Sequence, residues 1–253
     1  MPDSVRKCRK GHITPLDCLP GWGWPVFAVQ AMPSLRTLLA QHGPVLLLDA
    51  ASTLIQVGWL EGDCQDWRWA SAEAEAGVGL FDCVARLGRN PNEARAFVYC
   101  EGPGSILGIR TAAAAIRAWN VVTPRPCWAY RSLDLLVHSL PEGARVIADA
   151  RRDTWHLAER GREMRRAPSS ELAGLAGLHT PGSFRAWTKL PAAVSPAIIP
   201  YSLSSLLPGL LDSDLLLPAP EPDAFLHEDP SYATWTPQIH RAPVQSTARP
   251  PAS

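Results

Sequence analysis

The feature that most constrains the fold is an apolar segment that runs into a turn with two glycines and then into a helix. Residues 96–100, Ala-Phe-Val-Tyr-Cys, predict a buried strand. Gly102, Pro103 and Gly104 end that strand in a tight turn, and Ser105 is a good helix N-cap. Such an order places N–H groups at a helix N-terminus, where an anion or a partner's carboxylate can bind. The alternative is a plain strand-to-helix connection.

The helix predicted over residues 105–118 has two faces. Four apolar residues at helical spacing are expected to face a sheet: Ile106, Ile109, Ala113 and Ile116. Arg110, Ala114 and Arg117 lie together on another face, where small residues let a second helix approach closely. The alternative is that the alanines only favour the helix and that the arginines face solvent.

Three strands linked by hairpins are predicted ahead of that segment, over residues 45–49, 54–60 and 64–69. A helix over residues 71–87, capped by Ser71, follows them. We expect the strands, with residues 96–100, to form one mixed sheet that carries the two helices side by side. A later hairpin is predicted over residues 145–155. Its first strand ends in Asp149, just as the strand over residues 45–49 ends in Asp49.

The residues of these segments resemble the TsaB family. The stretch Gly102-Pro103-Gly104-Ser105-x-x-Gly108-x-Arg110 is similar to the family's Gly-Pro-Gly-Ser-Phe-Thr-Gly-Leu-Arg signature. The second hairpin keeps Asp149, Ala150 and Arg151 of the family pattern Ala-Ile-Asp-Ala-Arg-x-x-Glu-Val-Tyr. The resemblance covers residues 44–159 and, weakly, 229–232. The chain departs from the family pattern at five positions: Ala50, Ile106, Leu107, Thr154 and Trp155.

The resemblance implies an α/β fold of the ribonuclease-H-like type (actin/Hsp70/sugar-kinase class), with a reduced second lobe. It also implies a non-catalytic subunit that supports threonylcarbamoyl transfer to adenosine in tRNA, together with a TsaD-like catalytic subunit and a TsaE-like ATPase. A homodimer through the same helices is a further expectation. The residues expected at the partner interface are Gly77, Gly79, Arg110, Ala114 and Arg117.

The composition limits the partners. Twenty-four basic residues balance twenty-four acidic ones, so no global field attracts nucleic acid, and tRNA is expected to be reached only through a partner. The 46% hydrophobic content, the scattered cysteines and the lack of an apolar run of about 20 residues predict a cytoplasmic protein without a membrane segment.

The chemistry-bearing residues favour a non-catalytic role. The seven histidines include no pair four residues apart, and Cys8, His12 and Cys18 make a poor zinc motif. We therefore expect neither ATP turnover nor a structural metal. The one cofactor that the resemblance allows is ADP or ATP bound at a partner interface. The rival is an actin-like phosphotransferase or hydrolase with Asp49 and Asp149 as Mg²⁺ ligands; a third alternative is a pure scaffold. Ala50 and Trp155 argue against a phosphate clamp.

Four regions are predicted along the chain. Residues 1–42 are expected to be a poorly ordered extension, with Met32 as a more suitable start. Residues 43–160 hold the core lobe and the start of the second lobe, 161–240 the reduced remainder, and 241–253 a flexible tail. Within the reduced remainder, residues 171–178 are predicted to form a short helix and residues 184–190 a strand.

Overall fold

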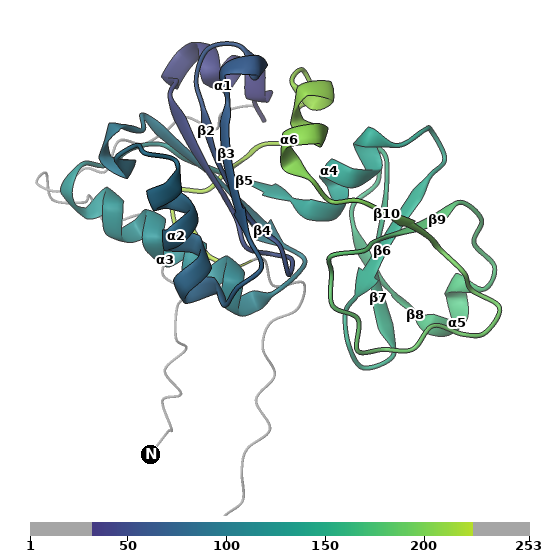
Figure 1. The fold of residues 1–253 in the computed structure, drawn as a ribbon. Coiled ribbons are helices and arrows are strands. Elements are labelled where there is room, and N and C mark those ends of the chain that lie inside the picture. The colour runs from purple at the N-terminus through teal and green to yellow at the C-terminus, as the bar shows by residue number, and fades with distance from the viewer. Residues whose placement is uncertain (1–31, 225–253) are drawn as a thin grey trace, which may run out of the picture.

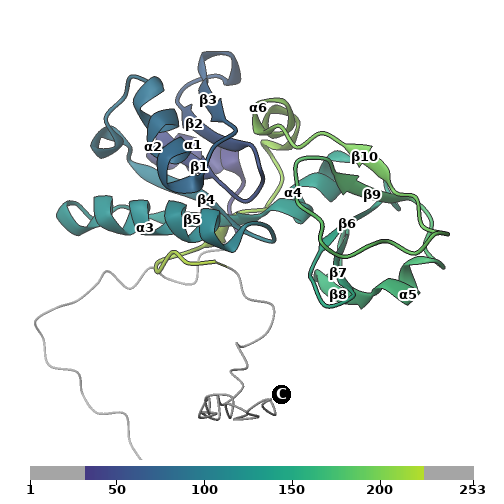
Figure 2. The same cartoon turned by 60° about the horizontal axis from the view of Figure 1, so that its bottom comes forward.

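The protein, described by a computed structural model over residues 32–224, consists of two lobes, each built on one mixed sheet (Figures 1 and 2). The first sheet has the strand order β11-β5-β4-β1-β2-β3. Its central strand, β1, is antiparallel to β2 and parallel to β4. The strands of this sheet are β1 (Val45–Asp49), β2 (Ile55–Leu60), β3 (Arg68–Ala72), β4 (Ala96–Gly102), β5 (Cys127–Arg131) and β11 (Leu217–Pro218).

The second sheet repeats this arrangement. Its order is β10-β9-β6-β7-β8, with β6 antiparallel to β7 and parallel to β9. In both lobes, a three-strand meander is therefore extended on its first strand by two parallel strands. This duplicated order is that of the ribonuclease-H-like, actin-type class, so the fold prediction is confirmed. The strands are β6 (Arg145–Asp149), β7 (Thr154–Glu159), β8 (Arg165–Pro168), β9 (Leu178–Pro181) and β10 (Ala197–Ile199).

The helices gather on the first lobe. Helices α2 and α3 pack beside each other on its sheet, as expected, and α4 lies between the two sheets (Figures 1 and 2). Within residues 32–224, the second lobe has only the four-residue α5 between its strands, which agrees with a reduced lobe. The helices are α1 (Leu35–His42), α2 (Ala76–Arg86), α3 (Ile106–Val122), α4 (Ser132–Ser139), α5 (Ser169–Leu172) and α6 (Leu203–Leu206), with 3-10 turns η1 (Cys64–Asp66), η2 (Pro91–Glu93) and η3 (Leu207–Leu210).

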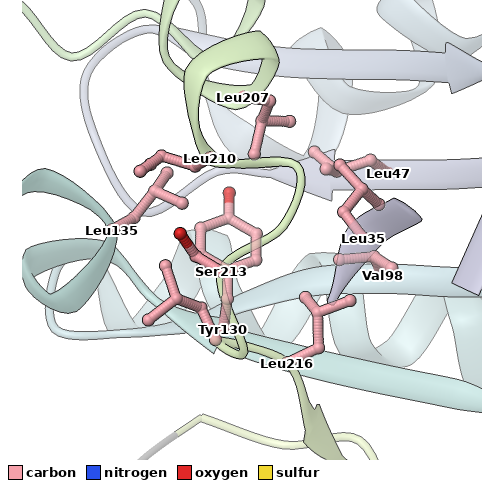
Figure 3. A pocket seen from close by; sticks show the side chains of 10 residues that line it. Leu35, Leu47, Val98, Tyr130, Leu135, Leu207, Leu210, Ser213 and Leu216 are labelled. Atoms are coloured by element: carbon pink, nitrogen blue, oxygen red, sulfur yellow. The ribbon is translucent and has the colours of Figure 1, made fainter. Parts of the chain in front are cut away.

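One hydrophobic core runs through both lobes. The central strand β1 is buried over its whole length, and Val146 and Ala158 of the second sheet belong to the same core. Where η3 packs over the first sheet, a cavity of about 20 Å³ remains, with room for about one water molecule (Figure 3). Leucines line this cavity together with Tyr130. The opposite face of the second sheet has a separate, smaller cluster around Trp155.

Several sequence predictions about elements are wrong. Ser71 lies in β3 and the following helix begins at Ala76, because the alternating pattern of the third strand continues to Ala72. Residues 184–190 form a loop rather than a strand. Residues 35–42, placed in a poorly ordered extension, form α1, whose Leu35 and Leu38 are buried. The helix expected over 171–178 is the short α5, followed by β9.

The predicted core face of α3 is confirmed at three of four positions. Ile109, Ala113 and Ile116 are buried, whereas Ile106 is 42% exposed because it occupies the first turn, beyond the edge of the sheet. Among the described residues, no helix has the length and apolar character needed to cross a membrane. Cys8, His12, Cys18, residues 229–232 and the tail at 241–253 lie outside the described range.

Candidate functional site

The glycine turn packs α3 directly onto the loop between β1 and β2. A Cβ atom on Gly104 would lie 2.3 Å from the carbonyl oxygen of Ala51, and one on Gly108 would lie 1.9 Å from that of Ala50. Both distances are far below any van der Waals contact, so only glycine fits at these two positions. The small side chains of Ala50 and Ala51 complete the close approach.

The contact between the glycine turn and the β1–β2 loop occupies part of the N-terminus of α3, where the sequence suggests an anion site as one of two interpretations. The Ser105 N–H donates to the carbonyl of Ala51 (2.7 Å), and the Ser105 Oγ accepts from the Gly108 N–H (3.3 Å). Ser105 is therefore the N-cap, as predicted. Because protein atoms satisfy these donors, the geometry favours the plain strand-to-helix connection, built to bring α3 against the first hairpin.

Asp49, the first strand-end acid, is fully buried. Its Oδ2 accepts from the hydroxyls of Tyr130 and Tyr201, both at 2.5 Å, and its Oδ1 accepts from the Ala51 N–H at 2.9 Å. Burial raises the pKa of Asp49, and the two tyrosine hydroxyls oppose that shift only in part. With both oxygens occupied by protein donors, Asp49 has no free oxygen for a metal ion.

Asp49 also connects the lobes. Tyr201 lies on the segment that leaves β10 of the second lobe and enters α6. Gln56 holds the same segment, because its amide donates to the Tyr201 carbonyl (3.1 Å) and accepts from the Leu203 N–H (2.8 Å). Sequence reasoning missed Tyr130, Tyr201 and Gln56, since a lone tyrosine or glutamine in an apolar run carries no pattern of its own.

Asp149, the second strand-end acid, is partly exposed and organises a turn. It accepts from the backbone N–H groups of Arg151 (2.6 Å), Trp187 (2.5 Å) and Thr188 (3.0 Å), and from the Thr188 hydroxyl (2.7 Å). Burial opposes its ionisation, but these donors outweigh burial and lower the pKa of Asp149. The carboxylate thus joins the β6–β7 turn to the loop that contains Trp187.

The β6–β7 turn itself has an uncommon backbone. Three consecutive non-glycine residues adopt left-handed angles, each of which costs about 1–2 kcal/mol. Backbone hydrogen bonds within the turn and the contacts to Asp149 offset this cost. The residues are Arg151 (φ 62°), Arg152 (φ 51°) and Asp153 (φ 58°).

The surroundings of the two acids do not favour the metal site of the rival hypothesis. Asp49 faces a buried tyrosine pair, and Asp149 faces N–H groups of its own lobe. Across residues 32–224, no cluster of three or more histidine, cysteine or acidic side chains is placed to hold a metal ion.

Most of the residues predicted for the partner interface lie on the outer face of α2 and α3. Gly77, Ala114 and Arg117 are exposed, and Arg110 is exposed beside Asp223, at 3.5 Å. The prediction for Gly79 is wrong. Gly79 is buried, and a Cβ there would lie 2.7 Å from the Ile55 side chain of β2.

Sequence reasoning missed the apolar residues of this surface, although helical spacing from Leu107 would have indicated some of them. Phe81 of α2 packs edge-on against Trp119 of α3, with ring centroids 6.5 Å apart, so the surfaces of the two helices are continuous. We call this surface the α2–α3 face. Its exposed apolar residues are Val78, Phe81, Leu107, Val121 and Val122.

Similarity to known proteins is found among solved structures. No family model matches the chain, and no curated protein does. YeaZ from Pseudomonas aeruginosa has a TM-score of 0.48 at 22% identity, covering 72% of this chain and 99% of YeaZ. A protein described as similar to peptidase YeaZ, from the same organism, has a TM-score of 0.48 at 18% identity, covering 65% of this chain and 89% of that protein.

At these TM-scores and identities the likeness carries no argument about what the chain does. The chain has a two-lobed fold with the duplicated strand order of the ribonuclease-H-like class, and YeaZ is among the solved structures that it resembles.

Proposed function

We propose that this chain is a non-catalytic subunit that supports threonylcarbamoyl transfer to adenosine in tRNA, and that it binds a TsaD-like catalytic subunit through the α2–α3 face. The observation that carries the proposal is the group of exposed apolar side chains on two adjacent helices. Val78 is 59% exposed, Leu107 74% and Val121 82%. Apolar side chains gathered on one face are typical of protein–protein interfaces.

The spacing on α3 suits a partner helix. Leu107, Ala114 and Val121 are seven residues apart and therefore lie along one stripe of the helix. Ala114, at its centre, leaves little side-chain bulk, so a partner helix can pack at about 8 Å between axes. Arg110 and Arg117 lie beside this stripe, where exposed charges mainly guide orientation.

The first hairpin supports a non-catalytic role. An actin-like phosphotransferase needs a carboxylate that can reach a metal ion, and Asp49 is buried beneath two tyrosines. Within the machinery that the family resemblance implies, a TsaE-like ATPase and any ADP or ATP would associate with the assembled complex, and tRNA modification would take place on the catalytic subunit.

The test is co-purification of tagged variants with the cell's own TsaD-like subunit. Ala114→Glu should weaken binding by about 30-fold or more, because it places an unpaired charge at the packed centre. Arg117→Ala should change binding by less than about fivefold, since exposed charges contribute little net affinity. Neither change should alter the melting temperature by more than about 2 °C, because both side chains point away from the sheet.

Ser170→Glu, on the exposed surface of α5, adds the same charge at a distance from the α2–α3 face and should bind as the unaltered protein does. Normal binding by Ala114→Glu would overturn the proposed surface. If Ala114→Glu instead abolishes self-association and leaves the TsaD-like subunit bound, a second copy of this chain occupies the face.

A further inference from the structure

Although the whole chain has no net charge, the two lobes differ strongly in net charge. Residues 144–200, which form the second lobe, contain nine arginines or lysines and five acids, a net charge of +4. The rest of the described chain, residues 32–143 and 201–224, contains nine arginines and fifteen acids, a net charge of −6. The second lobe therefore presents a positive field that the composition of the whole chain conceals.

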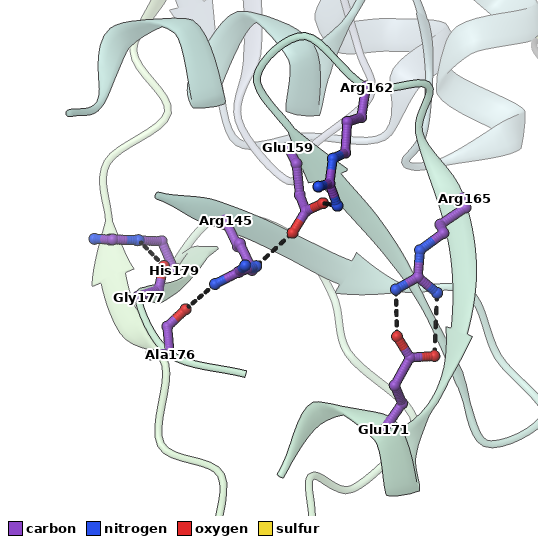
Figure 4. A network of polar contacts seen from close by, with 8 residues as sticks. All are labelled: Arg145, Glu159, Arg162, Arg165, Glu171, Ala176, Gly177 and His179. Atoms are coloured by element: carbon purple, nitrogen blue, oxygen red, sulfur yellow. Dashed lines mark hydrogen bonds and ion pairs between the residues drawn. The ribbon is translucent and has the colours of Figure 1, made fainter. Parts of the chain in front are cut away.

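Five of the nine basic side chains of this lobe already have protein partners. Arg145 and Arg162 both pair with Glu159, and Arg165 pairs with Glu171 (Figure 4). Arg160 donates to main-chain carbonyls at the end of α4, and Arg166 to Ala150 and Thr154. These contacts stabilise the lobe and reduce the availability of their charges to a ligand.

The other four cations accompany an exposed tryptophan. In the part of the chain that the structure describes, no carboxylate pairs with Arg151, Arg152, Arg185 or Lys189, and all four are exposed. Trp187, between Arg185 and Lys189, is 65% exposed, and the Arg151 guanidinium lies 5.3 Å from the centre of its ring. We call these five residues the Trp187 patch.

Asp149 fixes the arrangement of the Trp187 patch. It accepts from the N–H groups of both Arg151 and Trp187, so the turn and the loop that contain these residues are held together. Asp149 and the exposed Asp153 are the acids closest to the patch in sequence, and four cations against two acids still leave a net charge of +2. The loop also contacts the first lobe, because the Ser183 carbonyl accepts from the N–H and hydroxyl of Thr53.

We propose that the Trp187 patch binds an unpaired nucleotide of a single-stranded RNA, with the base stacked on the Trp187 ring and the neighbouring phosphates held by Arg151, Arg152, Arg185 and Lys189. Arg151 covers one side of the indole, and the remaining ring surface is open to a flat, apolar group. An exposed aromatic ring among unpaired cations is the combination with which proteins hold single strands. This site is separate from the α2–α3 face and does not depend on the catalytic partner.

The test measures binding of a fluorescently labelled, unstructured RNA decamer to the full chain by anisotropy, over a series of salt concentrations. If all four cations contact phosphates, the logarithm of the association constant should fall with the logarithm of salt concentration with a slope of about −3. Arg185→Gln should reduce that slope by about 0.7. Trp187→Ala should weaken binding by roughly 5- to 100-fold with the slope unchanged, and Trp187→Phe should retain most of the affinity.

Two control variants remove comparable groups elsewhere. Ile198→Ala shortens an apolar side chain of the same lobe that is 77% exposed, and Arg68→Gln removes an exposed cation of the first lobe. Both should bind RNA as the unaltered chain does. The proposal is overturned if Trp187→Ala binds the decamer normally, if free ATP displaces the decamer as well as unlabelled decamer does, or if the chain binds anionic phosphatidylglycerol vesicles and no RNA. Failure of RNA binding would leave partner binding through the α2–α3 face untouched.

Discussion

Asp49 shows how burial and two tyrosine hydroxyls set the environment of a strand-end carboxylate. It ends the central strand of the first lobe, where an actin-like enzyme needs a metal ligand. Tyr130 and Tyr201 instead donate to the same carboxylate oxygen, and both hydroxyls are buried. The carboxylate connects the segment between β10 and α6 to the β1–β2 hairpin. Its burial makes the stability of the fold depend on pH.

Burial raises the folded-state pKa of Asp49 above its ordinary value of 3.8, so the folded protein holds this proton more tightly than the unfolded chain does. The contribution to stability is greatest below pH 4 and is lost as pH rises through the folded-state pKa. Cys100, Tyr130 and Tyr201 face the carboxylate, and their pKa values are also raised, so they stay protonated from pH 4 to 8.

Asp49→Asn should therefore flatten the decline in unfolding free energy between pH 4 and 8, as measured by urea titration. The asparagine still accepts from the Ala51 N–H and donates to the tyrosine hydroxyls, which can rotate to accept. Asp49→Ala is the contrasting variant and should cost about 1–3 kcal/mol for each buried hydroxyl left unsatisfied. An unchanged pH slope in Asp49→Asn would show that the carboxylate is not the group responsible.

The strand-end position of Asp49 was predictable from sequence, but its environment was not. Val45 to Leu48 form a continuous apolar run, which is typical of a buried central strand. Tyr201 lies 152 residues away and reaches Asp49 only because the second lobe folds back on the first. No local pattern carries such a contact. The Trp187 loop was predicted to be a strand for a related reason, since its Phe184 and Leu190 pack against the two hydrophobic clusters from a loop rather than from a sheet.

The helices α2 and α3 show where local patterns suffice at the scale of an element. Ser105, the apolar spacing and the glycine turn predicted the start of α3 correctly, because capping and periodicity are local. The start of α2 was misplaced, because Glu75 occupies the N-cap without a side-chain cap hydrogen bond and thus leaves no signal. Tertiary packing also decides whether a glycine lies in a close contact or in open space, and the sequence alone does not distinguish these two cases.

A matched pair of substitutions separates these glycine roles. Gly108→Ala should destabilise the protein by about 1–3 kcal/mol or more, because its Cβ would overlap the Ala50 carbonyl, a backbone atom that cannot rotate away. Gly77→Ala, in the first turn of α2 with nothing within 4 Å, should stabilise it by up to about 1 kcal/mol. Urea titrations of both variants measure the difference. Equal effects would contradict the close contact between α3 and the first hairpin.

The whole molecule combines a shared core with a small local one. Val146, Ala148 and Ala158 of the second lobe belong to the main core, whereas the other face of that sheet carries, among the described residues, a separate cluster of six buried residues. Hydrogen bonds between Gln56 and the segment that joins β10 to α6, and from Thr53 to Ser183, also cross between the lobes. A cluster of six residues is too small to hold a domain by itself.

We therefore expect the two lobes to unfold together, in a single transition seen at the same urea concentration by far-ultraviolet and near-ultraviolet circular dichroism. Ile147→Ala, in the small cluster, and Leu47→Ala, in the shared core, should each lower the free energy of unfolding by about 2–5 kcal/mol. The midpoint of the single transition should fall accordingly, with the urea dependence of the free energy unchanged. Ile198→Ala is the control and should leave the midpoint nearly unchanged, because this side chain is 77% exposed. If Ile147→Ala instead splits the curve and shifts only an early phase, the second lobe unfolds independently, and the contacts of Tyr201, Gln56 and Thr53 do not couple the lobes.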